Sequence, residues 1–108
     1  CGEPCDIGWS VLKEHAGIFV SMPDWVAANG MRILANPLGC DLKVVSGESG
    51  AAGLGCAAEI LRRKDLAELK DHLGLGADSR ILCISTEGDT DRENYRNIVW
   101  YGKYPGEK

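Results

Sequence analysis

The chain has 108 residues and a formal net charge of −4, and 44% of its residues are hydrophobic. This length suits one domain with a single core. Its 12 Lys and Arg residues are scattered, so the sequence offers no basic patch for nucleic acid. No apolar run approaches the ~20 residues of a membrane span, and no signal peptide is apparent. We therefore expect a cytoplasmic protein with neither nucleic acid nor membrane as a partner.

The chain opens on "CGEP" without a Met, which predicts a piece of a longer polypeptide. Cys1 and Cys5 have no second Cys or His pair at ligand spacing, so we expect no metal site. Cys56 lies in an Ala-rich helical pattern and Cys83 in an apolar run, where reduced cysteine behaves as a small hydrophobe. We expect free thiols, and a disulfide is the alternative.

Helical patterns alternate along the chain with short apolar runs. Asp6 is expected to cap the first helix, and Ser21 and Asp24 have the spacing of a capping box before the second. Thr90 and Glu93 have the same spacing at the last helix. The expected helices cover residues 7–15, 21–36, 49–64, 65–74 and 90–102, and the expected strands are "GIFVS" (17–21), "LKVVSGE" (42–48) and "SRILCIS" (79–85).

Short, wholly apolar strands that alternate with helices are typical of a parallel sheet covered on both faces. The predicted fold class is therefore α/β, a three-layer partial parallel sheet with helices on both faces. In such sheets ligands lie at the carboxyl ends of the strands. Two polar clusters would lie there, "SGESG" (46–50) and "STEGDTD" (85–91). We expect these clusters to meet around a ligand.

Each cluster also fits a purely structural interpretation. The glycines of the first cluster would make a tight turn, with Ser46, Glu48 and Ser49 as helix caps. Asp89, Thr90 and Asp91 of the second would only cap the last helix. The stretch "GESGAAGLG" has no G-x-G-x-x-G register and no Gly-Lys-Ser/Thr, which excludes a dinucleotide fingerprint and a P-loop. The residue pattern alone leaves the ligand site and the capping interpretation open.

Longer stretches carry a family resemblance. "CGEP", "FVSMPDWVAANGMRIL", "VVSGESGAAGLG" and "ISTEGDTDRENYRNIVW" together resemble the C-terminal third of the diaminopropionate ammonia-lyases. These are pyridoxal-phosphate (PLP) enzymes of the tryptophan synthase β fold. The resemblance covers essentially the whole chain, so residues 1–108 are expected to be the C-terminal segment of a PLP-binding domain.

The resemblance implies a cofactor site in the two clusters. In this fold a neutral hydroxyl meets the pyridine nitrogen of PLP, and Ser85 matches that position with Thr86 beside it. Glu48 matches an acidic residue near the ring, and Gly47 is expected to allow close approach of the backbone. The implied reaction is α,β-elimination of ammonia from 2,3-diaminopropionate to give pyruvate.

The family's Schiff-base lysine, acid–base carboxylates and phosphate-binding loop match no position here, so the resemblance implies no catalytic residue in this chain. We expect the isolated chain to be inactive. The implied partners are an amino-acid substrate, the remainder of the same enzyme chain and further copies in a homo-oligomer. Two alternatives remain open: another PLP-dependent β-eliminating lyase, such as a serine or threonine dehydratase relative, and a non-catalytic scaffold that kept the fold.

Overall fold

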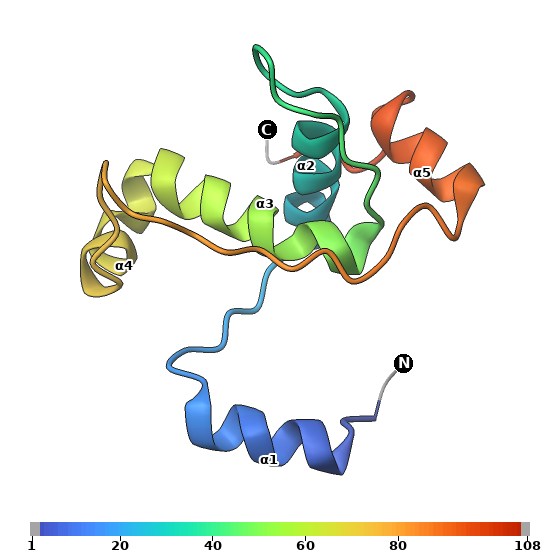
Figure 1. The fold of residues 1–108 in the computed structure, drawn as a ribbon. Helices are drawn as coiled ribbons and strands as arrows, with labels where there is room; N and C mark the ends of the chain where they lie inside the picture. The colour runs from blue at the N-terminus through green and yellow to red at the C-terminus, as the bar shows by residue number, and fades with distance from the viewer. Residues whose placement is uncertain (1–2, 107–108) are drawn as a thin grey trace.

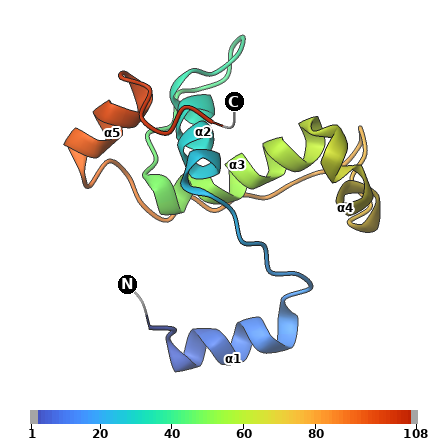
Figure 2. The same ribbon diagram turned by 180° about the vertical axis from the view of Figure 1, so that it is seen from behind.

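The computed structural model describes residues 3–106, so Cys1 lies outside the described residues. Figures 1 and 2 show that the helices after the first one lie together in one body, while the first helix lies apart from it at the end of an extended linker. The helices are α1 (Asp6–His15), α2 (Asp24–Ala35), α3 (Glu48–Arg62), the short 3₁₀ helix η1 (Lys64–Leu66), α4 (Ala67–His72) and α5 (Arg92–Val99).

The predicted α/β fold class is wrong for this chain, because the described residues contain no strand and no sheet. The three segments expected to be strands have no regular secondary structure over residues 17–21, 42–47 and 79–85. The middle segment donates the Val44 N–H to the Leu34 carbonyl of α2 at 2.9 Å instead of forming a ladder. A strand needs the backbone of a neighbouring strand as a partner. The apolar pattern of a segment does not reveal whether that neighbour is present.

The body is built on close contact between α2 and α3. A Cβ on Gly30 of α2 would overlap the Ala51 carbonyl oxygen, and a Cβ on Gly55 of α3 would overlap the Val26 carbonyl oxygen. The backbones of the two helices therefore touch at these glycines. Gly53, which lies two residues before Gly55 in α3, takes no part in this contact, because a Cβ there would meet open space.

A small core forms where α5 packs over the α2–α3 contact. Its members are fully or almost fully buried: Ala28, Met31, Ala51 and Ile98. Arg32 connects α5 and the segment that follows it to this core. Its guanidinium donates hydrogen bonds to the carbonyl oxygens of Ile98 (3.1 Å), Lys103 and Tyr104 (3.1 Å). The segment after α5 is thereby held against α2.

The helices begin close to the expected places, but their caps differ from the prediction. Cys5, and not Asp6, precedes the first turn of α1, and Pro23 precedes α2 without any side-chain capping bond. In α5 the cap is Asp91, whose Oδ1 accepts the Asn94 N–H at 3.0 Å. The observed cap and its partner, Asp91 and Asn94, therefore each lie one residue later than the predicted pair, Thr90 and Glu93.

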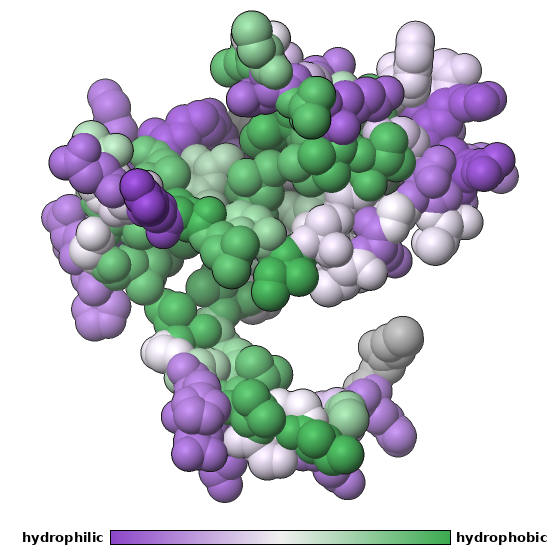
Figure 3. Space-filling model, viewed as in Figure 1, coloured by the Kyte–Doolittle hydropathy of each residue, from purple (hydrophilic) through white to green (hydrophobic). Residues whose placement is uncertain are grey.

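The first helix buries none of its residues and packs against no other helix in the part of the chain that is described. Ile7 is 80% exposed and Phe19 of the linker is 64% exposed, and the ring centroids of Phe19 and Trp9 lie 6.1 Å apart. Figure 3 shows apolar side chains on α1 and on the facing side of the body. Within residues 3–106, none of the helices combines the length and apolar content that crossing a bilayer requires.

Candidate functional site

The two polar clusters lie against each other, although the described residues contain no sheet of the kind from which the sequence analysis expected them to project. The Gly47 N–H donates to the Glu87 carbonyl oxygen at 3.1 Å. Beside this bond the hydroxyl oxygens of Ser46 and Ser85 lie 2.8 Å apart. Ser46 is completely buried and Ser85 is exposed. The two clusters are thus in direct contact through both backbone and side-chain groups.

Gly47 leaves space for the second cluster in this structure. A Cβ at this position would lie 2.6 Å from Glu87 Oε1 and 2.7 Å from the Gly88 carbonyl oxygen. Glu87 Oε1 also accepts the Ser49 N–H at 3.1 Å. Because the free N–H groups at a helix N-terminus attract anions, the carboxylate of Glu87 stabilises the start of α3. This role of Glu87 could not be predicted from the sequence, since a capping bond between residues so far apart in sequence leaves no local pattern.

Glu48 opens α3 and does not cap it. Its Oε1 accepts a hydrogen bond from the Asn94 side chain at 3.0 Å, and the Asn94 carbonyl oxygen in turn accepts one from Lys103 Nζ at 2.9 Å. Lys103 Nζ also lies 4.9 Å from the centroid of the Tyr104 ring. The Glu48 carboxylate is therefore held in place from α5 and the segment after it. Neither Asn94 nor Lys103 was singled out from the sequence, because the last helix was considered only for its cap.

A cavity of about 100 Å³ lies beside Gly47 and Glu48. This volume is below the roughly 300–1,000 Å³ of ordinary ligand pockets. Burial, together with the Asp89 carboxylate, raises the pKa of Tyr95, whose hydroxyl reaches no hydrogen-bond partner among the described residues. The cavity is rimmed by acidic side chains, which disfavour a bound anion: Glu48, Glu87, Asp89 and Asp91.

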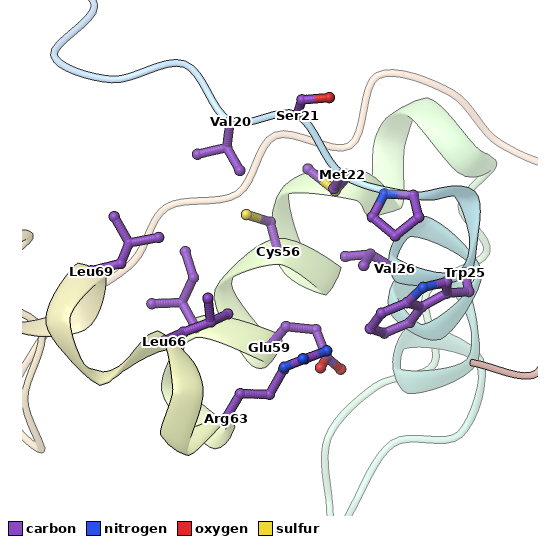
Figure 4. A pocket seen from close by; sticks show the side chains of 12 residues that line it. Val20, Ser21, Met22, Trp25, Val26, Cys56, Glu59, Arg63, Leu66 and Leu69 are labelled. Carbon is purple, nitrogen blue, oxygen red and sulfur yellow. The ribbon is translucent and has the colours of Figure 1, made fainter. Parts of the chain in front are cut away.

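A larger hollow of about 330 Å³ lies further along α3, beside Cys56 and Glu59, and Figure 4 shows side chains from the linker, α2, α3 and α4 around it. Most of its lining is apolar. The buried carboxylate of Glu59 receives bonds of 2.7 and 2.9 Å from Arg62, and the Arg63 guanidinium lies 5.9 Å from the Trp25 ring centroid. The Cys56 thiol also lines the hollow, and its burial raises its pKa. The hollow therefore contains no free base or activated nucleophile among these groups.

The remaining reactive side chains do not gather around the clusters. Cys5, Cys40, Cys56 and Cys83 are free thiols. No group of three or more His, Cys, Asp or Glu side chains within residues 3–106 is arranged to hold a metal ion. What the clusters offer is an exposed hydroxyl, a buried hydroxyl behind it and a fixed carboxylate. These groups can form hydrogen bonds to a ligand, and the family resemblance implies such a bond for Ser85 and a place near the cofactor ring for Glu48.

Comparison with known proteins finds no matching family model. The chain is 49% identical over 104 residues to the diaminopropionate ammonia-lyase of Escherichia coli (strain K12), which covers 96% of this chain and 26% of that protein. It is 43% identical to the diaminopropionate ammonia-lyase of Salmonella typhimurium, covering 95% of this chain and 26% of that protein. The chain thus spans about a quarter of the length of these relatives.

Solved structures agree with the sequence comparison. The chain matches the crystal structure of the E. coli diaminopropionate ammonia-lyase in complex with D-serine with a TM-score of 0.88 at 49% identity, covering 96% of this chain and 27% of that one. The TM-score is also 0.88 against the same enzyme in complex with an aminoacrylate-PLP azomethine reaction intermediate, with 28% of that chain covered. The resemblance to diaminopropionate ammonia-lyase is therefore confirmed over 96% of this chain, which corresponds to the C-terminal quarter, about 26%, of that enzyme.

Proposed function

We propose that this chain is the C-terminal part of a PLP-dependent diaminopropionate ammonia-lyase, which eliminates ammonia from 2,3-diaminopropionate to give pyruvate. One observation carries the proposal: 49% identity and a TM-score of 0.88, over 96% of the chain, to an enzyme of that name with an aminoacrylate-PLP intermediate bound. When bound, PLP supplies the electron sink that stabilises a carbanion at the α-carbon of an amino acid. The chain contributes groups that hold one edge of the cofactor ring.

Ser85 is the proposed partner of the pyridine nitrogen, with Thr86 next to it. Both side chains are exposed, so a ligand can reach them without a rearrangement of the core. A hydroxyl donates a hydrogen bond to a pyridine nitrogen without requiring that the nitrogen carry a proton, unlike a carboxylate partner. The electron sink is then moderate, and expulsion of a β-leaving group competes well with other fates of the carbanion.

Gly47 and Glu48 are the proposed neighbours of the ring on the other cluster. Both line the small cavity, and Glu48 is already fixed by Asn94. They are assigned a place beside the ring and not at its nitrogen, because a carboxylate partner would require that nitrogen to carry a proton. They do not fit a phosphate, because the rim of the cavity is acidic and carries Glu87 at the start of α3. The phosphate group and the covalent attachment of PLP are therefore assigned to the rest of the enzyme.

The remainder of the same enzyme is the proposed partner of the exposed apolar surface. Apolar side chains on α1, the linker and the segment before Ser85 are strongly exposed, including Ile7 (80%), Phe19 (64%) and Leu82 (88%). An extended apolar surface of this kind is typical of a protein contact. The proposal also includes an amino-acid substrate, assembly as a homo-oligomer and a cytoplasmic location, to which free cysteine thiols are suited.

A chimera tests this function directly. The C-terminal quarter of the E. coli diaminopropionate ammonia-lyase is replaced by this chain, and PLP uptake and ammonia release from 2,3-diaminopropionate are measured. We expect the chimera to bind PLP and to release ammonia, because the replacement keeps 49% identity over 104 residues. The matched controls are the intact E. coli enzyme and the same enzyme truncated at the junction.

Alanine variants of the chimera distinguish the roles of the two hydroxyls at the proposed ring contact, Ser85 and Thr86. Ser85→Ala is expected to lower turnover more than it weakens PLP binding, because the lost contact tunes the electronics of the ring. Thr86→Ala is expected to change both less. A folded chimera that takes up PLP but releases no ammonia would contradict the proposed reaction, and damage by Thr86→Ala alone would move the contact to that residue.

A further inference from the structure

The hydroxyl pair of Ser46 and Ser85 has one short contact and several long ones. The two Oγ atoms lie 2.8 Å apart, which is the usual length of a strong O–H···O bond. The alternative acceptors are further away. The Gly47 carbonyl oxygen lies 3.2 Å from Ser46 Oγ, and the Glu87 carbonyl oxygen lies 3.4 Å from each hydroxyl. One of the two protons therefore occupies the short contact.

Burial decides which hydroxyl is the donor. Ser46 has no exposed surface, so its proton must point to an acceptor within the protein, and Ser85 Oγ is the nearest. Leaving a buried hydroxyl with a poor partner costs about 1–3 kcal/mol. Ser85 is exposed, so its own proton has an acceptor outside the protein. The arrangement with Ser46 as donor satisfies both groups.

Close packing keeps the pair in this position. A Cβ on Gly50 of α3 would lie 2.7 Å from Ser85 Oγ and would also overlap Ser46 Oγ. The pair therefore occupies space that only glycine leaves free. Just beyond it, the bond from the Gly47 N–H to the Glu87 carbonyl holds the two segments together. The pair is therefore packed directly against α3.

We propose that Ser46 is a positioning residue that donates its proton to Ser85 and so directs the Ser85 O–H outward as a strengthened donor for the pyridine nitrogen of PLP. A hydroxyl that accepts a hydrogen bond is polarised and becomes a better donor. The inference rests on the proposed function. It adds a buried residue that does not touch the cofactor and acts on it through Ser85.

The first arm of the test uses the 108-residue chain without cofactor. Urea unfolding of Ser46→Ala, Ser85→Ala and the double variant measures how strongly the two hydroxyls are coupled. We expect Ser46→Ala to raise the unfolding equilibrium constant about fivefold, the usual worth of one hydrogen bond. In the Ser85→Ala background the same change is expected to have a smaller effect. Additive effects would overturn the inference.

The second arm uses the PLP-loaded chimera described above, with the pyridine nitrogen labelled with ¹⁵N. Ser46→Ala is expected to move the ¹⁵N chemical shift in the same direction as Ser85→Ala, toward the value of a pyridine nitrogen without a hydrogen bond. The matched control is Ser49→Ala, which removes an exposed hydroxyl from the same cluster. This control is expected to leave the shift unchanged.

The outcomes separate the inference from the function on which it rests. An unchanged ¹⁵N shift in Ser46→Ala, with lowered stability, would make Ser46 a purely structural residue and overturn the inference alone. A chimera that takes up no PLP even with Ser46 present would overturn the proposed function, and the inference with it. Coupled unfolding together with a moved ¹⁵N shift would support both.

Discussion

The body of α2, α3 and α5 and the arm formed by α1 with its linker use apolar side chains in opposite ways. In the body, Met31 and Ile98 are almost or fully buried and the α2 and α3 backbones touch at Gly30 and Gly55. In the arm, no residue of α1 is buried, and Ile7 is 80% exposed. The same kind of helical pattern therefore gives a packed helix in one region and an uncovered one in the other.

This difference fits the proposal that the arm packs against the remainder of the enzyme, whereas the body packs on itself. Helical stability in proteins comes mostly from packing of an apolar face, and α1 has no such packing within the described residues. Substitutions in the body should therefore lower the free energy of unfolding of the isolated chain, and similar substitutions in the arm should leave it nearly unchanged.

The largest effect is expected at the contact between α2 and α3. Gly30→Ala places a Cβ where the Ala51 carbonyl oxygen lies, so the helices must separate. We expect a loss of about 3 kcal/mol in the free energy of unfolding, at the upper end of the cost of overpacking, measured by urea denaturation.

The control for this substitution is Gly53→Ala on α3, where the new methyl group meets open space. This variant should be unchanged or more stable by about 0.5–1 kcal/mol, since alanine is the better helix former. Equal stability of the two variants would show that the helices are not in backbone contact.

Core truncation compares the two regions most simply. Met31→Ala should cost about 2–3 kcal/mol, because the side chain is 1% exposed and its removal leaves a cavity. Ile7→Ala in α1 should change the free energy of unfolding of the isolated chain by less than about 0.5 kcal/mol. A large loss of stability from Ile7→Ala would mean that the arm packs on the body in solution.

A smaller effect is expected at the start of α5. Asp91→Ala removes the acceptor of the Asn94 N–H and should cost about 1 kcal/mol. Asp89→Ala is the matched control, because within residues 3–106 Asp89 forms one ion pair, a 4.0 Å contact with the exposed Arg92. Thermal unfolding of both variants decides the point, and equal losses would contradict the assignment of Asp91 as the cap.

The smallest effect is a difference in reactivity between two thiols. Hydrogen bonds from the backbone of Gly8 and Ile7 lower the pKa of Cys5 in the arm, whereas burial raises the pKa of Cys56 in the body. Because the thiolate is the nucleophile, Cys5 should be alkylated faster near neutral pH. Mass spectrometry of iodoacetamide-treated chain measures the two rates, and a difference that persists in urea would rule out the folded structure as its cause.

The sequence predicted the helices well and the sheet wrongly, for an identifiable reason. The spacing of apolar residues that predicts α2 and α3 is a property of each segment alone, and both helices are present within a few residues of their expected bounds. The short run before Ser85 has the composition of a buried strand, but strand formation depends on a neighbour. That neighbour is not part of the segment, so the prediction failed there.

The candidate site was predictable in part. Ser85 and Glu48 were singled out through a family resemblance, and the meeting of their two clusters is confirmed by the bond between Gly47 and Glu87. Ser46 and Asn94 were not predicted as partners of these residues, because their hydrogen bonds join positions that are 39 and 46 residues apart. Contacts of that kind depend on how the helices pack, which no local pattern contains.

Hydrogen exchange followed by mass spectrometry tests the contrast between body and arm most directly. It is measured on the isolated chain and on the chimera with the E. coli enzyme. We predict rapid exchange in α1 and the linker of the isolated chain, strong protection of α2 and α3 in both proteins, and new protection of α1 only in the chimera. Protection of α1 in the isolated chain, or its continued rapid exchange in a chimera that binds PLP, would contradict the account.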